Sequence, residues 1–424
     1  MIRSALCAIA VLLCFESAGA LTLQEAQQIA LSNNPELKAS HTEVDADEAA
    51  LTRSSSRFYP RFGVESRYEY FDSAFERRRG GTGNLFAEWN LFNGLQDVSA
   101  RQARKLDVEV SRLRFALTKQ KVIWAVESAF GKVLALQETI ALHDAALDRN
   151  LANQKAARGR RAAGVVSDAD VLEFDLYESI LRADLAAAQG DLKAAEAEFR
   201  KVLGDDSVEF PLVGQIQRYQ LNSKLEAIVA DLPQTNAEIR TTQMDVQRAE
   251  AEVKVATAGF LPQVRAFASY GSLGLRETQI SPETYAGVVA RWELFSGFDT
   301  IGARHEARHR VVHAESDLKA AQIAQKGEAE ETFARIKSLE FRIQLEERNH
   351  ETAHRYMRTV IDEYRRGVKN SPDLKNATDN VLRSHLREVN LRAEYLDQAM
   401  ALNTITGGRA IFEKLKTEER KEEK

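Results

Sequence analysis

The sequence contains two short motifs whose residue types could bind zinc and catalyse hydrolysis. Both have the form H-E-x-x-H: His305-Glu306-Ala307-Arg308-His309 and His350-Glu351-Thr352-Ala353-His354. Residues four apart share one face of a helix, so each histidine pair could hold a zinc ion while the glutamate acts as a general base. The spacing therefore raises the hypothesis of a metalloprotease.

The surroundings of the two motifs argue against catalysis. They lie about 60 Å apart on one long helical pattern, so the pairs cannot share an ion. Neither has an evident third ligand, and the corresponding segment of an internal repeat, Gln102 to Asp107, contains no histidine. We predict no catalytic residues, no metal site and no cofactor. Metal binding by the clusters His305, His309, His313 and His350, His354 stays an open alternative.

The elements that carry these motifs belong to an internal duplication. The stretch from Leu85 to Arg104, LFAEWNLFNGLQDVSARQAR, returns as Val288 to Arg308, VVARWELFSGFDTIGARHEAR. In each copy a run with a period of two residues meets a glycine turn and passes directly into a helical pattern. Further landmarks recur at offsets of 202 or 203, so we predict two tandem structural repeats.

Composition favours long regular elements over a loop-rich enzyme. The 424 residues include only 7 Pro and 22 Gly, and 44% are hydrophobic and 29% charged. The net charge of -5 provides no basic excess for nucleic acid. No segment has eighteen consecutive apolar residues, so the sequence predicts no transmembrane helix.

The first twenty residues predict a secretory signal peptide. Arg3 precedes an apolar run from Ala5 to Phe15, and Ala18-Gly19-Ala20 is typical of a cleavage site before Leu21. Both cysteines, Cys7 and Cys14, lie in this segment, so we expect a mature chain without disulfides.

Capping signals and apolar periodicity predict long helices. Thr22-Leu23-Gln24-Glu25 forms a capping box, and Asn34-Pro35 separates two short helices. From about Val98 to Arg158 there is no proline, and about sixty residues would span about 90 Å. Two apolar seams run along this stretch, one through Val122, Val126, Ala129, Val133, Leu136 and Ile140, the other through Ile123, Phe130 and Leu134. Such a helix packs between two neighbours, as in a ring or bundle.

Two predicted strand pairs alternate apolar and polar residues. After Pro60, Phe62, Val64, Tyr68 and Tyr70 share one face, and a charged loop from Asp72 to Thr82 leads to a second strand ending near Leu91. The second repeat supplies an equivalent pair that includes Trp292 and Leu294 in its last strand. Strands of about ten residues are long enough to cross a bilayer when tilted.

The predicted boundaries follow from these patterns. They are a signal peptide at 1–20; a first repeat at 21–204 with a β-hairpin at about 61–92 and a helical tip near 164–170; a second repeat at 205–408 with a β-hairpin at about 263–295 and a tip near 367–373; and a charged, solvated C-terminal tail at 409–424.

Four amphipathic strands cannot close a barrel alone. An open edge in a membrane would leave unpaired backbone groups at a cost of several kcal/mol each, so strands must come from other copies of the chain. Two chains would supply eight strands and three would supply twelve, and the pattern does not choose between them.

Several motifs in order resemble the TolC family of outer-membrane efflux proteins. They are the start LTLQEAQQIALSNNPEL, the Phe-x-Pro entries to the strands, the Trp-x-Leu-Phe-x-Gly exits and the Gly-Val-x-(Ser/Asn)-x-x-Asp tips. The resemblance implies a mixed α and β membrane protein: a homotrimer whose 12-stranded transmembrane barrel, with four strands per chain, continues as a long α-helical barrel in the periplasm. It also implies a passive duct for efflux or type I secretion. The partners would be outer-membrane lipid, a periplasmic adaptor (membrane fusion protein) and an inner-membrane pump of the RND or ABC type.

The resemblance also assigns candidate functional residues. The periplasmic tips, where the adaptor would dock, are Gly164, Val165, Ser167, Asp170 and Val171, and Gly367, Val368, Asn370, Asp373 and Leu374. Any αα-hairpin needs such glycine C-caps and polar N-caps, so these residues also have a purely structural interpretation. Asp373 would line the entrance constriction, but Asn376 stands where some members have a second acid. Trp89 and Trp292 are candidate interface aromatics of the barrel, or simply barrel packing.

A second class of function stays open at this point. A non-pore periplasmic coiled-coil protein, structural or adaptor, would account for the long helices but would not need lipid-facing strands. The exported substrate and the pump class are not encoded in any motif that we identify.

Overall fold

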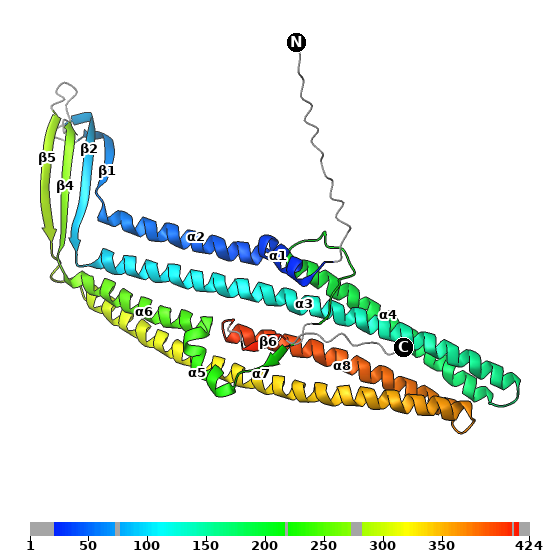
Figure 1. Cartoon of the computed structure of the whole chain (residues 1–424). Coiled ribbons are helices and arrows are strands. Elements are labelled where there is room, and N and C mark those ends of the chain that lie inside the picture. Colours follow the sequence, from blue (N-terminus) through cyan, green and yellow to red (C-terminus); the bar gives the residue numbers. More distant parts are fainter. Residues whose placement is uncertain (1–20, 73–76, 217–218, 273–281, 409–410, 415–424) are drawn as a thin grey trace, which may run out of the picture.

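The structure, a computed structural model, describes residues 21–72, 77–216, 219–272, 282–408 and 411–414. The predicted signal peptide at 1–20 and the last residues of the predicted tail, 415–424, lie outside the described residues. Within them the chain is elongated, with a sheet at one end and two helical hairpins reaching the other (Figure 1).

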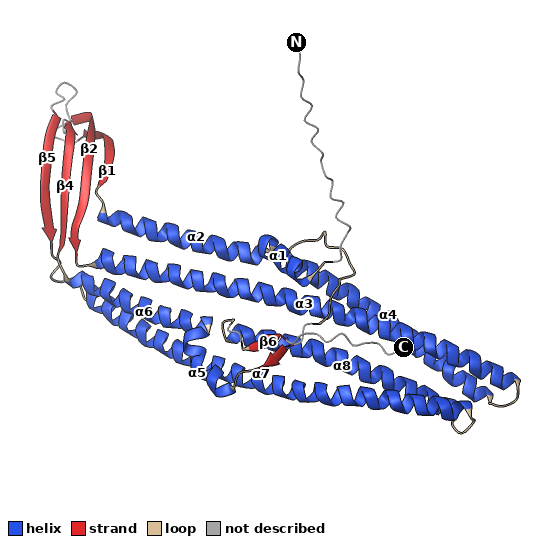
Figure 2. Cartoon of the chain, in the orientation of Figure 1, coloured by secondary structure: helices blue, strands red, loops and turns tan. Residues whose placement is uncertain are grey.

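In each half of the chain, two short helices are followed by two long strands and then by two long helices (Figure 2). The helices are α1 (Leu23–Asn33), α2 (Pro35–Ser55), α3 (Gln96–Ala162), α4 (Asp168–Leu203), α5 (Leu225–Thr235), α6 (Ala237–Thr257), α7 (Asp299–Arg365) and α8 (Ser371–Ile405). The strands are β1 (Arg61–Asp72), β2 (Arg77–Asn93), β3 (Tyr219–Leu221), β4 (Gln263–Ser272), β5 (Pro282–Arg291) and β6 (Phe412–Lys414). Two 3-10 turns, η1 (Ser56–Phe58) and η2 (Ala258–Phe260), precede β1 and β4.

The long strands form one antiparallel sheet in the order β1-β2-β4-β5. The predicted loop from Asp72 to Thr82 is wrong over most of its length, because β2 begins at Arg77 and every residue from there to Thr82 pairs with β1. Within this stretch, the Tyr68 ring of β1 lies beside Gly81 of β2, so an aromatic side chain packs over that glycine.

The end of the second strand pair also differs from its prediction. β5 stops at Arg291, so Trp292 and Leu294 lie beyond the strand, whereas β2 continues through Trp89 and Leu91 to Asn93. The reason is pairing. Arg291 lies opposite the first residue of β4, and in the described sheet β5 has no neighbour on its other side to extend it.

A tight turn converts strand into helix in both halves of the chain. Gly94 has a φ of 67°, and a Cβ there would lie 2.6 Å from the carbonyl oxygen of Ala258, so only glycine fits. The next residue, Leu95, also has a positive φ, as does Phe298 at the start of α7. The sequence pattern located this junction but gave no indication that bulky residues adopt the left-handed conformation.

The helices have matching lengths in the two halves. α3 and α7 contain 67 residues each, α2 and α6 contain 21 each, and α1 and α5 contain 11 each. At 1.5 Å per residue α3 and α7 each span about 100 Å. The predicted capping box at Thr22 and Glu25 is confirmed, as is the helix break before Pro35.

The core follows the long helices as a series of apolar clusters. On α3, Val122 and Val126 pack in a cluster with α1 and α4, whereas Trp124 packs in another with α5 to α8. The predicted packing of this helix between two sets of neighbours is therefore confirmed, but its seams are not divided as predicted, because Phe130 and Leu134 lie in the same cluster as Val122 and Val126. Of two smaller clusters toward the hairpin tips, one joins α3 and α4 to both α7 and α8, and the other joins α3 and α4 to α8.

The C-terminal segment does not begin as the predicted solvated tail. Ile411 is buried, and Phe412–Lys414 forms β6, which pairs with β3. This pairing was not predicted because each strand is three residues long, too short for a period to be recognised.

In the part of the chain that the structure describes, none of the helices combines the length and the apolar character needed to span a bilayer.

Candidate functional site

The first H-E-x-x-H motif lies on the exposed surface of α7. Glu306 forms an ion pair with Arg310 (2.6 Å), and both side chains are largely exposed. His313, the third histidine of this cluster, pairs with Asp317 (2.9 Å). A glutamate that faces solvent and forms an ion pair with an arginine is not positioned to activate a bound water.

The second motif meets a histidine that the sequence did not point to. The ring of His350 lies 4.5 Å from that of His354 and 4.6 Å from that of His385, which comes from α8. His385 in turn contacts Glu138 of α3 (3.4 Å). Sequence reasoning did not identify this neighbour, because it lies in a different helix. Among the described residues, however, no three His, Cys, Asp or Glu side chains are arranged to hold a metal ion.

The two helical tips are built by the same local bonds. Gly164 and Gly367 have φ values of 74° and 79°, and the following amides, Val165 N and Val368 N, donate to carbonyl oxygens five residues back (2.9 Å each). This is the Schellman arrangement that ends a helix at a left-handed glycine. Val165 and Val368 are left 62% and 70% exposed, so each tip presents an apolar side chain to solvent.

Capping boxes begin the returning helices. Asp170 N donates to the Ser167 hydroxyl (3.3 Å), while the Asp170 carboxylate accepts from Ser167 N (3.0 Å). Asn370 and Asp373 form the equivalent pair. The hydroxyl of Ser167, which donates to Asp170, is the main cause that lowers the pKa of this carboxyl. The structural interpretation of these residues is thus confirmed.

Polar contacts join the first tip to the second. Asp170 Oδ1 accepts a hydrogen bond from the buried Ser371 N (3.4 Å). The Arg160 guanidinium lies over the Tyr364 ring at 4.6 Å and donates to the Tyr364 carbonyl oxygen (2.9 Å). Val171 and Leu374 are buried in the cluster between the hairpins. The tips therefore form one unit rather than two independent loops.

The candidate constriction residues lie on the first turns of α8. Asp373 is 3.9 Å from Lys369. Lys375 bridges to Glu173 of α4 (3.2 Å) and donates to the side chain of Asn376 (3.2 Å). The first turns of α8 therefore carry the positive charge of Lys375 next to the neutral Asn376, as well as the negative charge of Asp373.

At the opposite end, the sheet exposes one apolar face. Phe62, Val64 and Tyr68 of β1 are each more than 70% exposed, and the same face continues across the other strands. Its further exposed members are Tyr70, Leu85, Trp89, Leu91, Tyr270 and Val288. A contiguous exposed apolar surface is typical of a site that contacts a partner protein or a membrane.

The two candidate tryptophans make the same hydrogen bond in different settings. Trp89 Nε1 donates to the carbonyl oxygen of Phe58 (3.0 Å), and Trp292 Nε1 donates to that of Phe260 (3.1 Å). Each indole ties the strand exit to the 3-10 turn that precedes the entering strand. This bond gives both residues a structural role at the junction between sheet and helices.

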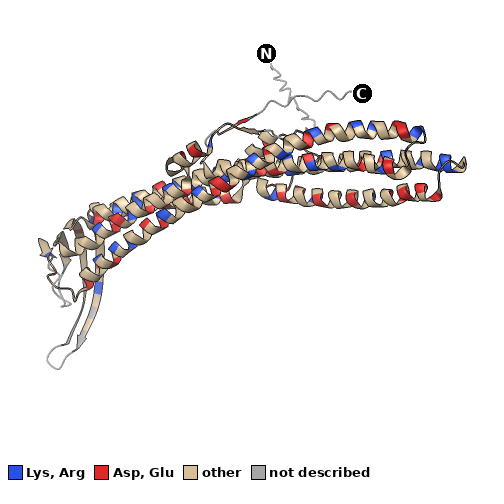
Figure 3. Ribbon diagram, turned by 90° about the horizontal axis from the view of Figure 1, so that it is seen from below, with Lys and Arg blue, Asp and Glu red and all other residues tan. Residues whose placement is uncertain are grey.

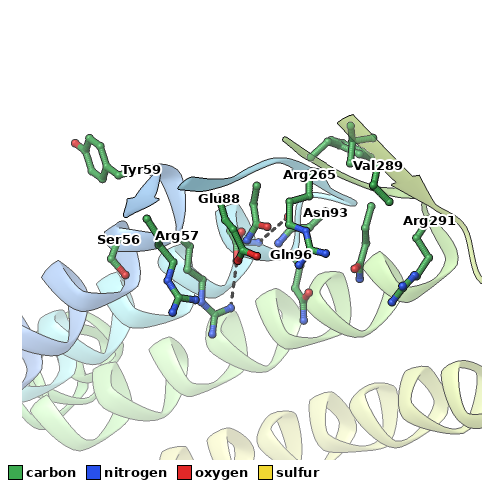
Figure 4. Close-up of a pocket in the computed structure, with 15 residues that line it drawn as sticks. Ser56, Arg57, Tyr59, Glu88, Asn93, Gln96, Arg265, Val289 and Arg291 are labelled. Atoms are coloured by element: carbon green, nitrogen blue, oxygen red, sulfur yellow. Dashed lines mark hydrogen bonds and ion pairs between the residues drawn. The ribbon is translucent and has the colours of Figure 1, made fainter. Parts of the chain in front are cut away.

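The polar side of the strand ends lines an open cavity of about 530 Å³ next to the junction. Figure 4 shows Arg57, Glu88, Arg265 and Arg291 on one side of the strands, between the sheet and the helices. Arg57 forms an ion pair with the buried Asp97 (3.1 Å). Sequence reasoning missed this cluster because its members come from separate strands and from the turn before β1.

The comparisons with known proteins match most of the chain. The family model described as outer membrane efflux protein matches twice, at residues 26–205 and 229–408. Protein CyaE of Bordetella pertussis is 25% identical over 419 residues, which covers 91% of this chain and 84% of that protein. The outer membrane efflux protein BepC of Brucella suis is 22% identical and covers 91% of this chain and 85% of its own length.

A solved structure has the same fold. The outer membrane protein VceC from Vibrio cholerae superposes with a TM-score of 0.79 at 16% identity, and the match covers 91% of this chain and 96% of that one.

Proposed function

Because the chain belongs to the outer membrane efflux protein family, we propose that it is the outer-membrane channel of an efflux or type I secretion assembly. One observation carries this proposal best: an amphipathic four-stranded sheet leads, through short connections after β2 and β5, into helices of 67 residues. One chain thus has a surface for lipid at one end and a reach of about 100 Å from it.

A trimer accounts for the open edges of the sheet. Within the described sheet, β1 and β5 each have one neighbour, so both outer edges carry unpaired backbone groups. In a membrane these groups must be paired, and strands of neighbouring chains can pair with them. Three chains would give a closed barrel of twelve strands, continued by a helical barrel in the periplasm. The two matching halves of each chain would then be tandem repeats.

The duct is passive in itself. Neither H-E-x-x-H motif is arranged for catalysis, so the energy for export would come from an inner-membrane pump. A periplasmic adaptor would connect the two. The exposed apolar face of the sheet supports this function over a non-pore coiled-coil protein, which would have no need of it.

The tips support docking of the adaptor. Val165 and Val368 project from a unit that is otherwise fixed by caps and contacts between the hairpins. Asp373 would lie at the entrance, with Lys375 and Asn376 weakening any ring of acids there. Substitution of Val165 or Val368 by cysteine, in a mature chain expected to lack other cysteines, should give crosslinks to an adaptor. Cysteine at Val312, exposed far from the tips, serves as the control.

Membrane fractionation and bilayer recordings test the function itself. We expect a heat-sensitive trimer that is extracted from the outer membrane only by detergent and that conducts ions in a planar bilayer. A soluble, elongated monomer would contradict the proposal. So would a membrane-bound trimer that never conducts, because it would favour a structural role.

A further inference from the structure

The cavity at the base of the sheet has a clear excess of positive charge. Four arginines line it, Arg57, Arg61, Arg265 and Arg291, against two carboxylates, Glu88 and Asp97, an excess of two positive charges per chain. Arg57 is paired with Asp97, so that pair is neutral. Among the described residues no carboxylate lies within ion-pair distance of Arg61, Arg265 or Arg291.

Strand geometry places these arginines on the face opposite the apolar one. Arg61 and Phe62 are adjacent on β1, and Arg265 and Val264 are adjacent on β4, so their side chains point to opposite sides of the sheet. In the proposed barrel the apolar face must meet lipid, and the arginines must therefore face the lumen. Here the inference rests on the proposed function.

The strand register places the three arginines in neighbouring layers at the base of the sheet, with Arg61 directly opposite Glu88. Asn90 lies opposite Arg265, and Gln263 lies opposite Arg291, so neutral residues separate the two arginines from Glu88. Further along β1, Glu65 and Arg67 pair with each other (3.0 Å) and cancel. On the helices, Figure 3 shows acidic and basic residues mixed along their length. The excess at the base of the sheet is therefore not cancelled by the next charged pair on β1.

We propose that Arg61, Arg265 and Arg291 form a basic belt inside the lumen, where sheet becomes helix, and that this belt attracts anions and the carboxylate or phosphate groups of the cargo. A trimer would bring two excess charges from each of three chains, six in all, around one opening. Guanidinium groups stay protonated and present planar donors that fit both anions. Charges of one sign on the wall of a narrow passage raise the local concentration of counter-ions.

Reversal potentials across a planar bilayer in a KCl gradient test the belt. In Arg265→Gln/Arg291→Gln trimers we expect the anion-to-cation permeability ratio to fall by roughly two- to tenfold at 0.1 M salt. The difference from the unsubstituted channel should shrink at 1 M, where the Debye length falls from about 10 Å to about 3 Å. Arg265→Lys/Arg291→Lys keeps the charge and should keep most of the ratio.

A substitution that removes a negative charge from the same cavity distinguishes an effect of charge on ion selectivity from an effect of structural damage. Glu88→Gln removes a negative charge, so the anion preference should rise, whereas general damage to the cavity would move all variants in one direction. If the double variant does not form trimers, Arg291→Gln alone, at an exposed strand end, carries the test. Equal ratios in all conducting channels would overturn the belt but leave the duct intact. Absence of conductance in the unsubstituted channel would contradict the duct itself.

Discussion

Asp170 combines two roles within one side chain. It closes the capping box of α4 and also accepts a hydrogen bond from Ser371 in the other hairpin. We expect Asp170→Asn to destabilise the first turn of α4 by about 1 kcal/mol, because the Ser167 cap remains but its charged acceptor at Asp170 becomes a neutral amide. Amide hydrogen exchange of this turn would measure the effect. Asp373→Asn is the matched comparison, because Asp373 has the same capping role, and it should cost less if the bond between hairpins matters.

The pH dependence of this effect has a defined sign. The pKa of Asp170 is lowered in the folded protein, chiefly by the Ser167 hydroxyl, from its ordinary value of 3.8. A carboxyl with a lowered pKa stabilises the fold above its unfolded value and loses that contribution as pH falls through its folded value. The advantage over Asp170→Asn should therefore be full at pH 6, begin to fall near pH 3.8 and disappear only as pH falls further, through the lowered pKa of Asp170. An advantage that persists at low pH would contradict the role of the charge.

Residues with local causes were predictable from the sequence, and residues with distant partners were not. The caps at Ser167 and Asn370 depend on neighbours within three positions, so spacing alone identifies them. His385 approaches His350 only because α8 folds back on α7. Arg265 and Arg291 likewise meet in one cavity only through the register of the sheet.

At the level of elements, β6 ties the end of the described chain to the middle of the molecule. Asn222 N donates to the Ile411 carbonyl oxygen (3.0 Å), and the Phe412 ring packs edge-on against Tyr219 at 6.1 Å. Ile411 is only 3% exposed. In a chain that ends at Gly408, the free energy of unfolding should be lower by about 2–3 kcal/mol, the contribution of one buried isoleucine and several hydrogen bonds.

Two truncations separate this strand from the charged residues that follow. The chain ending at Gly408 should unfold at a lower denaturant concentration than the full chain. The chain ending at Lys414, which keeps β6, should match the full chain. If both truncations behaved alike, the stabilising contribution would not come from β6.

Element ends were harder to predict than element types. The alternation after Pro60 predicted the strand that is observed as β1, whereas the charge and glycine content of Asp72 to Thr82 suggested a loop where β2 continues. Pairing with β1 overrides the low strand propensity of these residues. Conversely, Trp292 has the right pattern for a strand but lacks a partner residue on β4.

At the scale of the whole molecule, equal lengths keep the two halves in register. Strand-to-helix junctions lie at one end, and α3 and α7 both run 67 residues from there to the tips. Only with equal lengths can Asp170 reach Ser371, and Tyr177 reach Asp379 (3.0 Å), across the two hairpins. The offsets of 202 or 203 in the sequence predicted this correspondence, although they could not predict the contacts themselves.

Shortening one hairpin should therefore disturb the contacts between the tips more than shortening both hairpins equally. Deleting seven residues from each limb of the first hairpin, 140–146 and 184–190, keeps the apolar seam in phase but withdraws its tip by about 10 Å. The contacts between the tips would be lost, and with them about 2 kcal/mol of stabilisation against local opening. Limited proteolysis should therefore cut the tips more than tenfold faster. Deleting 343–349 and 387–393 as well should realign the tips and restore their resistance. If the variant that lacks all four segments were cut by the protease as fast as the variant that lacks two, the matched lengths of the hairpins would not be what holds the tips together.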